Sequence, residues 1–157
     1  MLIQVIDESV RDEMKEFLKV KWGSMIVVSK GKAHNLEELP GFVVIENERI
    51  TGVVTYDVVD KDCEIISLDS VIENRGLGSK LLDKVIEIAK IVGCERVWLM
   101  TTNDNTKAMR FYQKRGFDLV GFYKDAMVKA REIKPEIPKI GYDDIPIKHE
   151  LEFEKII

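Results

Sequence analysis

The apolar residues of this chain change their spacing at one glycine-containing turn, Glu73-Asn74-Arg75-Gly76-Leu77-Gly78-Ser79. Before the turn they gather in short runs that predict strands. After it they recur at helical spacing, with a wide apolar face, until Gly93 ends the helix. A strand follows this helix. A strand, a helix and a second strand in this order predict a parallel pair joined by a crossover.

Three predicted strands lie directly before the turn, and only three residues separate each strand from the next. They run from Phe42 to Glu46, Ile50 to Val59 and Cys63 to Val71. Short turns join antiparallel neighbours, so this part is a meander. Beyond the helix, strands are predicted from Arg96 to Thr101 and from Phe117 to Tyr123, with a second helix between them. The expected fold is α+β: a central mixed α/β sheet in which an antiparallel meander joins a parallel pair, flanked by helices.

The N-terminal part has a strand pattern from Leu2 to Ile6 and a helix pattern in which Ser9 is the expected cap. Gly23 ends this helix. A strand is predicted from Met25 to Val28, followed by a polar connection that contains His34.

The tail has a separate character. A helix is predicted from Asp125 to Ile133, and apolar residues alternate with polar ones from Ile145 onward. The alternation predicts a half-buried strand that pairs with the strand ending at Tyr123. It places His149 on the apolar side, and Glu150, Glu152 and Glu154 on the other side. These acids either attract a cationic amine or form a solvated strand face, and we expect the solvated face. We expect one domain over residues 1–157, with 124–157 as a C-terminal helix-plus-strand extension.

Composition excludes several classes of protein. The net charge is −4, so a nucleic acid partner is not expected. No apolar run approaches the roughly 20 residues of a membrane-spanning helix, and no membrane partner is expected. The N-terminus lacks the pattern of a signal peptide, which makes the cytoplasm the expected location. Cys63, Cys94, His34 and His149 form no metal-binding spacing, so we expect no metal and two free thiols.

The glycines of the turn allow a ligand to reach backbone N–H groups at the start of the helix, where the helix dipole favours an anion. A Walker loop is excluded because Gly78-Ser79-Lys80 has the order reversed. A dinucleotide fingerprint would need a third glycine where Leu81 stands. Two interpretations stay open, a cradle for the pyrophosphate of coenzyme A and a glycine-rich turn without a ligand.

A second segment, Asn103 to Phe117, can be written Asn-x-x-Ala-x-x-x-Tyr-x-x-x-Gly-Phe from Asn105 onward. It resembles the second half of the motif of the GNAT N-acetyltransferase superfamily. The upstream Arg-Gly-Leu-Gly resembles the first half, Gln/Arg-x-x-Gly-x-Gly/Ala. The resemblance covers about residues 42 to 123. Glu73 departs from it, because the family has Gln or Arg there, so we expect backbone amides to carry the binding and the Glu73 side chain to turn away.

The resemblance implies that the strands from Cys63 to Val71 and from Arg96 to Thr101 splay apart and admit the pantetheine arm of acetyl-CoA. Amides from Asn74 to Ser79 would bind the pyrophosphate. Asn105 would hydrogen-bond the arm, cap the second helix, or do both. The implied acetyl-CoA contacts are Leu68, Asp69, Ser70, Val71, Asn74, Arg75, Gly76, Leu77, Gly78, Ser79, Asn105, Ala108 and Tyr112.

The implied activity is direct transfer of the acetyl group from acetyl-CoA to an amine of a small molecule or protein. Tyr112 matches the family tyrosine that protonates the leaving thiolate, or else it packs beside Phe111. Glu64 is the candidate base, with Asp69 or water as alternatives, and an amide of Leu68 or Asp69 would bind the oxyanion. A non-catalytic acyl-CoA-binding or scaffold domain is the alternative function. The acceptor stays open, and the tail strand allows a homodimer.

Overall fold

The computed structural model describes residues 1–71 and 76–157. The strands and helices in chain order are β1 (Leu2–Val5), α1 (Glu8–Trp22), β2 (Ile26–Ser29), β3 (Lys32–Asn35), η1 (Leu36–Glu38), β4 (Gly41–Glu46), β5 (Arg49–Val59), β6 (Asp62–Ser70), α2 (Leu77–Ile91), β7 (Arg96–Thr102), α3 (Thr106–Lys114), β8 (Asp118–Tyr123), α4 (Ala126–Ile133), η2 (Tyr142–Asp144) and β9 (Glu150–Ile156). None of these helices is long and apolar enough to cross a bilayer.

Seven strands form one mixed sheet in the order β1-β4-β5-β6-β7-β9-β8. The meander β4-β5-β6 is antiparallel, β6 and β7 are parallel, and β9 lies between β7 and β8. The predicted mixed sheet is therefore confirmed, as is the pairing of the tail strand with the strand ending at Tyr123.

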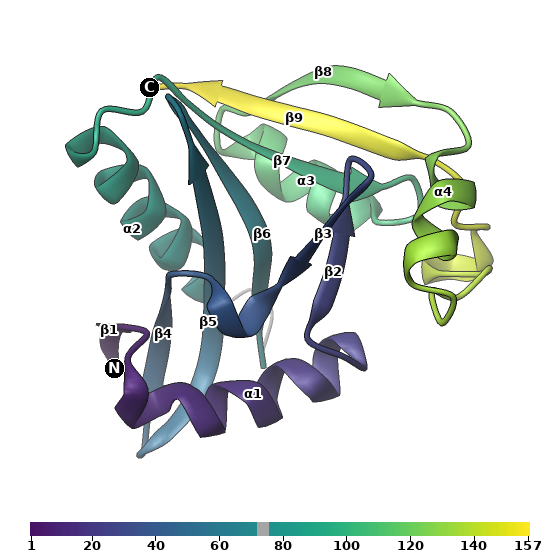
Figure 1. The fold of residues 1–157 in the computed structure, drawn as a ribbon. Helices are drawn as coiled ribbons and strands as arrows, with labels where there is room; N and C mark the ends of the chain where they lie inside the picture. The colour runs from purple at the N-terminus through teal and green to yellow at the C-terminus, as the bar shows by residue number, and fades with distance from the viewer. Residues whose placement is uncertain (72–75) are drawn as a thin grey trace.

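The parallel pair is short. The register of β6 and β7 runs only from Asp62 opposite Arg96 to Ile65 opposite Leu99. Beyond Ile65 the two strands diverge, as Figure 1 shows below their common upper end. A register shift between Thr55 and Tyr56 marks a bulge in the β5–β6 ladder at the same level. Bulges bend a strand and increase its twist, and this one stands where the strands separate.

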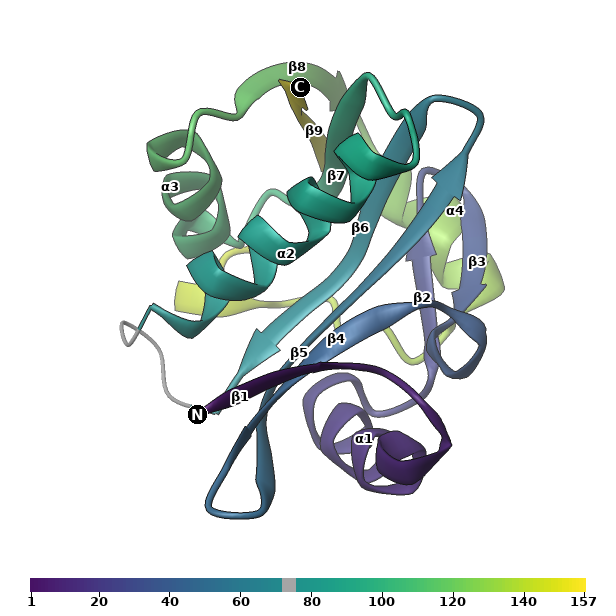
Figure 2. The ribbon, with the colours of Figure 1, turned by 90° about the vertical axis from the view of Figure 1, so that its left-hand side faces the viewer.

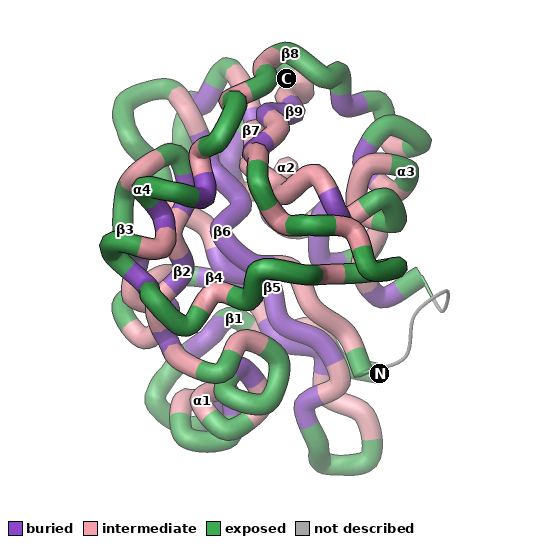
Figure 3. The backbone as a smooth tube through the Cα atoms, turned by 90° about the vertical axis from the view of Figure 1, so that its right-hand side faces the viewer, coloured by how far each residue is buried: buried purple, intermediate pink, exposed green. Residues whose placement is uncertain are grey.

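Two cores lie on opposite faces of the sheet. Helices α2 and α3 cover one face, where Leu81, Leu82 and Val85 pack against Val54 and Ile65. Helix α1 covers the other face with Met14 and Leu18. Figure 2 shows α2 and α1 on the two sides of the sheet, and Figure 3 shows that β5 and β6 are buried through their middle. Burial on both faces fixes β6 firmly at the centre.

Three local predictions were wrong. Asp7, not Ser9, caps α1, because its carboxylate accepts hydrogen bonds from both the amide and the hydroxyl of Ser9. The connection through His34 is a strand, β3, which forms a hairpin with β2. The tail strand begins at Glu150 and not at Ile145. His149 precedes it, and its Nδ1 accepts a hydrogen bond from the amide of Asp125.

The predicted solvated side of the tail strand is also wrong. Glu150 and Glu152 are buried, because the β2–β3 hairpin reaches this face of β9. The Glu152 carboxylate accepts hydrogen bonds from the Lys30 ammonium at 2.9 Å and the Tyr123 hydroxyl at 2.8 Å. These donors hold the pKa of Glu152 below its usual value against the opposing effect of burial. The hairpin and β9 therefore enclose a polar layer beside the parallel pair.

Candidate functional site

The divergence of β6 and β7 leaves one edge of β6, after Ile65, without a strand partner among residues 1–71 and 76–157. The Val71 amide donates to the Thr51 carbonyl on β5, and hydrogen-bonded pairs alternate along an antiparallel ladder. Asp69, opposite Val53, therefore directs its amide toward β5. Backbone groups of neighbouring residues in a strand point to opposite edges, so Leu68 directs its N–H and C=O toward the gap between β6 and β7. Ser70, another predicted acetyl-CoA contact, points to the same edge as Leu68, and its carbonyl accepts a hydrogen bond from Lys21.

The N-terminus of α2 lies at the wide end of this gap. Gly76 has a φ of 77°, which is the left-handed conformation that favours glycine. The first intrahelical bond joins the Lys80 amide to the Gly76 carbonyl, so the amides of residues 77–79 precede it. Asn74 and Arg75, which sequence reasoning placed in the cradle, lie outside the described residues, as does Glu73, whose side chain was expected to turn away.

Helices α2 and α3 approach closely at Gly78. A Cβ at this position would lie 3.2 Å from the Phe111 ring, so glycine permits the contact. Arg115 stacks on the same ring and donates a hydrogen bond of 2.6 Å to the Ser79 hydroxyl. The guanidinium thus lies beside the first turn of α2 and adds positive charge to that end of the helix.

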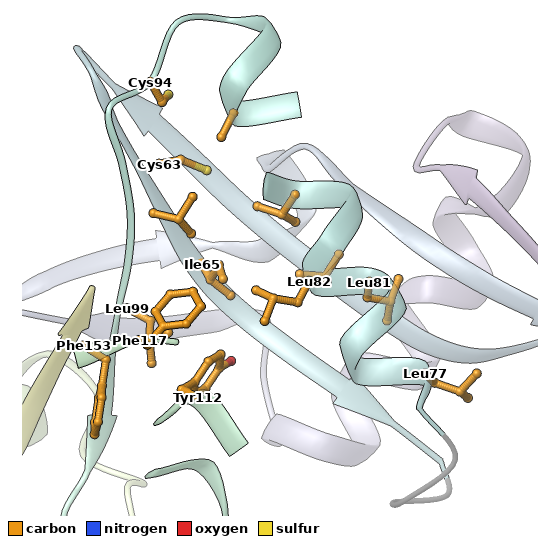
Figure 4. Packing of buried hydrophobic residues seen from close by; sticks show 14 of the residues in the cluster. Cys63, Ile65, Leu77, Leu81, Leu82, Cys94, Leu99, Tyr112, Phe117 and Phe153 are labelled. Atoms are coloured by element: carbon orange, nitrogen blue, oxygen red, sulfur yellow. The ribbon is translucent and has the colours of Figure 1, made fainter. Parts of the chain in front are cut away.

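Helix α3 brings Asn105, Ala108 and Tyr112 to the gap's other side. The Asn105 carboxamide oxygen accepts a hydrogen bond from the Ala108 amide, so the helix-cap role is present. Tyr112 is buried between Phe111 and Phe117. Figure 4 shows its ring beside Phe117 and Leu99, with the hydroxyl on the side of α2. Burial, and then the negative charge of Asp69, raise the pKa of Tyr112, so the phenol keeps its proton at neutral pH.

A cavity of about 290 Å³ opens on the opposite face, under the β2–β3 hairpin. Its lining residues are Ser29, Lys30, Lys32, His34, Asp57, Val59, Asp60, Asp62, Glu64 and Trp98. Glu64 stands one residue before the point where β6 and β7 separate. Ser29 donates a hydrogen bond of 2.5 Å to Glu64 Oε2. Burial raises the pKa of Glu64 to about 7, although the Ser29 hydrogen bond acts in the opposite direction.

Asp69, the alternative base, is placed differently. Its carboxylate accepts a hydrogen bond of 2.7 Å from the indole N–H of Trp22 on α1. Burial raises the pKa of Asp69 as well, and the Trp22 bond and the charge of Lys21 act against that rise. The Trp22 bond ties this carboxylate to α1, whereas Glu64 lines the cavity.

Sequence reasoning missed Ser29 and His34. The signal for their hairpin was the Lys30-Gly31 pair between two short runs of equal length, since both residues have positive φ. In the described part of the chain, His, Cys, Asp and Glu side chains form no group of three that could hold a metal.

Comparisons with known proteins agree with this geometry. The family model described as the Acetyltransferase (GNAT) family matches residues 8–117. The uncharacterized protein YdhI of Bacillus subtilis (strain 168) is 42% identical over 158 residues, which cover 100% of this chain and 99% of that protein.

Two solved structures share the fold. An IAA acetyltransferase from Bacillus cereus ATCC 14579 superposes with a TM-score of 0.77 at 18% identity, covering 99% of each chain. A GNAT family acetyltransferase from Elizabethkingia anophelis with acetyl-CoA bound has a TM-score of 0.72 at 20% identity, covering 99% of this chain and 97% of its own.

Proposed function

The chain belongs to the acetyltransferase (GNAT) family, and on that premise we propose that it transfers the acetyl group of acetyl-CoA directly to an amine of a small molecule or protein. The observation that carries the proposal is the divergence of β6 and β7 after Ile65, between Glu64 on one face and Tyr112 on the other. A thioester in this gap is reachable from both faces. The acetyl-CoA bound to the Elizabethkingia anophelis protein supports the same ligand here.

The pantetheine arm extends along the open edge of β6, as a peptide adds to a sheet edge. Leu68 and Ser70 supply main-chain groups to the arm. Asp69, which lies between them, and Val71, which follows Ser70, complete the stretch of chain that borders the arm. The Leu68 amide is placed to bind the oxyanion, because its N–H is directed into the gap and that of Asp69 is not. Asn105 and Ala108 border the arm from α3.

The pyrophosphate binds at the start of α2. Gly76 allows the turn, and the amides of Leu77, Gly78 and Ser79 point out of the helix end. Asn74 and Arg75 extend the same cradle in this proposal. Binding through main-chain donors explains why a glutamate at position 73 is tolerated, since no side chain there is needed for phosphate.

The chemistry needs a neutral amine, a polarised carbonyl and a proton for the thiolate. Glu64, with its pKa near 7, takes a proton from the acceptor amine, which enters from the cavity under the hairpin. Tyr112 gives its proton to the sulfur from the opposite face. Acid and base on different faces of the sheet keep the two proton transfers apart.

Two measurements test the proposal. Calorimetry with coenzyme A should show one site per chain, and an assay of free thiol with acetyl-CoA and a panel of amines should show turnover. Cofactor binding without thiol release from any amine would favour the acyl-CoA-binding or scaffold domain instead. Absence of cofactor binding would remove both functions.

A further inference from the structure

His34 stands between two carboxylates at the base of the cavity. Its side chain is 3% exposed, and its Nε2 lies 3.8 Å from Oε1 of Glu64. Its Nδ1 lies 3.9 Å from Oδ2 of Asp57. Within the described residues, Nε2 is buried and has no hydrogen-bond partner. A buried polar atom without a partner destabilises the fold, so its presence calls for an explanation, and this one faces the proposed base.

Amide formation from an ammonium removes two protons from the nitrogen. One must leave before the nitrogen attacks the thioester, and the second leaves as the tetrahedral intermediate collapses. The Glu64 carboxylate holds only one proton at a time. A second acceptor next to Glu64 would restore its charged form within the same turnover.

We propose that His34 is a positioning residue that acts through Glu64, receiving on Nε2 the first proton that Glu64 takes from the acceptor amine. This role rests on the proposed transferase function. The N–H bond of the ammonium breaks as an O–H bond forms on Glu64, and that O–H bond then breaks as an N–H bond forms on His34. Glu64, again a carboxylate, accepts the second proton. After the product leaves, one proton returns to Tyr112 through water and the other enters solvent.

Carboxylates lie on both sides of the His34 ring and would stabilise a transient imidazolium. Asp57 faces its Nδ1 from β5, and Glu64 faces its Nε2 from β6. Lys32, on the same strand, opposes the charge, but its ammonium lies 3.7 Å from Asp57. Burial, and then the charge of Lys32, lower the pKa of His34 against the opposing effect of Asp57, so the ring is neutral and able to accept a proton at the start of each turnover.

Lys30 on the hairpin turn pairs with Glu152 on β9, and Arg96 on β7 pairs with Glu152 and with Asp62 on β6. Glu150 on β9 accepts a hydrogen bond from the backbone amide of Lys30, and its charge helps to raise the pKa of Glu64. The 3.8 Å separation of His34 and Glu64 is longer than a hydrogen bond. Such distances commonly shorten when the substrate is bound.

Kinetics of His34→Gln provide the first test, with His149→Gln as the matched control, because these are the two histidines of the chain. We expect kcat of His34→Gln to fall about ten-fold at pH 7, with KM for acetyl-CoA changed less than about two-fold. The deficit should shrink toward pH 9, where hydroxide removes the proton instead. A loss that is the same at every pH would overturn the relay and leave His34 a packing residue.

Nuclear magnetic resonance tests the pair without activity. Two imidazoles give two sets of signals, and His149→Gln assigns them. The His34 signals should move with an inflection near pH 7 as Glu64 ionises, and Glu64→Gln should abolish that inflection. If the pH dependence of the His34 signals is the same with and without the Glu64→Gln substitution, the proposal is overturned, and this holds even if His34→Gln fails to fold. Another outcome is that the His34 signals follow the ionisation of Glu64 in a chain that acetylates no amine. That result would refute the transferase function and the proton relay, and it would leave only the electrostatic interaction between His34 and Glu64.

Discussion

The hydroxyl of Ser29 on β2 donates a hydrogen bond of 2.5 Å to the carboxylate of Glu64 on β6. The bond fixes the carboxylate at the narrow end of the gap between β6 and β7, where burial raises its pKa to about 7. The β2–β3 hairpin, which is not part of the parallel pair β6–β7, thus orients the candidate base through Ser29.

Replacing Glu64 by Gln should lower kcat about 100-fold at pH 7, with little change in acetyl-CoA affinity, because the general base is lost. In the unaltered chain kcat should rise with pH through about 7, as the carboxylate ionises. Steady-state kinetics from pH 5.5 to 9 measure this. If the variant and the unaltered chain have the same pH profile, Glu64 is not the base.

The same substitution should increase stability at high pH. A carboxyl whose pKa rises from 4.5 to about 7 on folding holds its proton more tightly in the folded state. Stability of the unaltered chain therefore falls between these pH values, by about 3 kcal/mol in total, and Glu64→Gln avoids that loss. Denaturant unfolding at pH 4.5 and pH 8 should show a gain only at pH 8. An equal effect at both values would contradict the buried ionisation.

Tyr112→Phe should lower kcat about 10- to 100-fold and leave the Kd of coenzyme A nearly unchanged, because the acid is removed and the ring stays. Phenylalanine retains the contacts with Phe111 and Phe117, whose ring centroids lie 5.0 and 5.4 Å away. Tyr56→Phe on β5 is the control for loss of a hydroxyl. Unchanged turnover in Tyr112→Phe would remove this tyrosine from the mechanism.

Gly76→Ala should weaken coenzyme A binding about ten-fold, since a Cβ at φ 77° distorts the start of α2. Gly93 offers a matched control at the other end of the helix, because it has a φ of 88° and open space around it. Both variants should lose about 1–2 kcal/mol of stability. Calorimetry should find weaker binding in Gly76→Ala alone. Equal affinities in both variants would place the pyrophosphate elsewhere.

The meander and α2 were predictable because their patterns are local. Apolar runs between short turns define β4 to β6, and helical spacing defines α2. Strand β3 was missed because Lys32-Ala33-His34-Asn35 has no apolar alternation, and its buried side chain is the polar His34. Nothing in a local pattern predicts that such a histidine is covered by other parts of the chain.

The tail strand shows the same limit of local patterns, although here the strand itself was predicted. Alternation predicted a strand there, but it could not predict what covers the glutamate side. Lys30 and Glu152 are 122 residues apart in the sequence, and their contact decides that Glu152 is buried. Periodicity tells which side chains share a face, whereas burial depends on which distant segment packs on that face.

The side chain of Lys134 supports the start of the β2–β3 hairpin. This buried lysine donates hydrogen bonds to the carbonyls of Ile26 at 2.8 Å and Trp22 at 3.4 Å, and it thereby ties the end of α4 to both sides of the α1–β2 turn. Lys134→Met should lower the free energy of unfolding by about 1–3 kcal/mol, because the carbonyls lose a donor.

The pH dependence of the free energy of unfolding distinguishes a charged hydrogen-bond donor at position 134 from a side chain that only packs. Burial lowers the pKa of Lys134, so the unfolded chain binds the proton more tightly and stability rises with pH below 10.5. Lys134→Met should lack that rise, and the exposed Lys124→Met should keep it. Denaturant unfolding at pH 7 and pH 10 measures both slopes. Because the hairpin carries Ser29 and His34, Lys134→Met should also reduce kcat more than acetyl-CoA affinity, and a variant that is less stable yet fully active would show that the hairpin holds its place without this lysine.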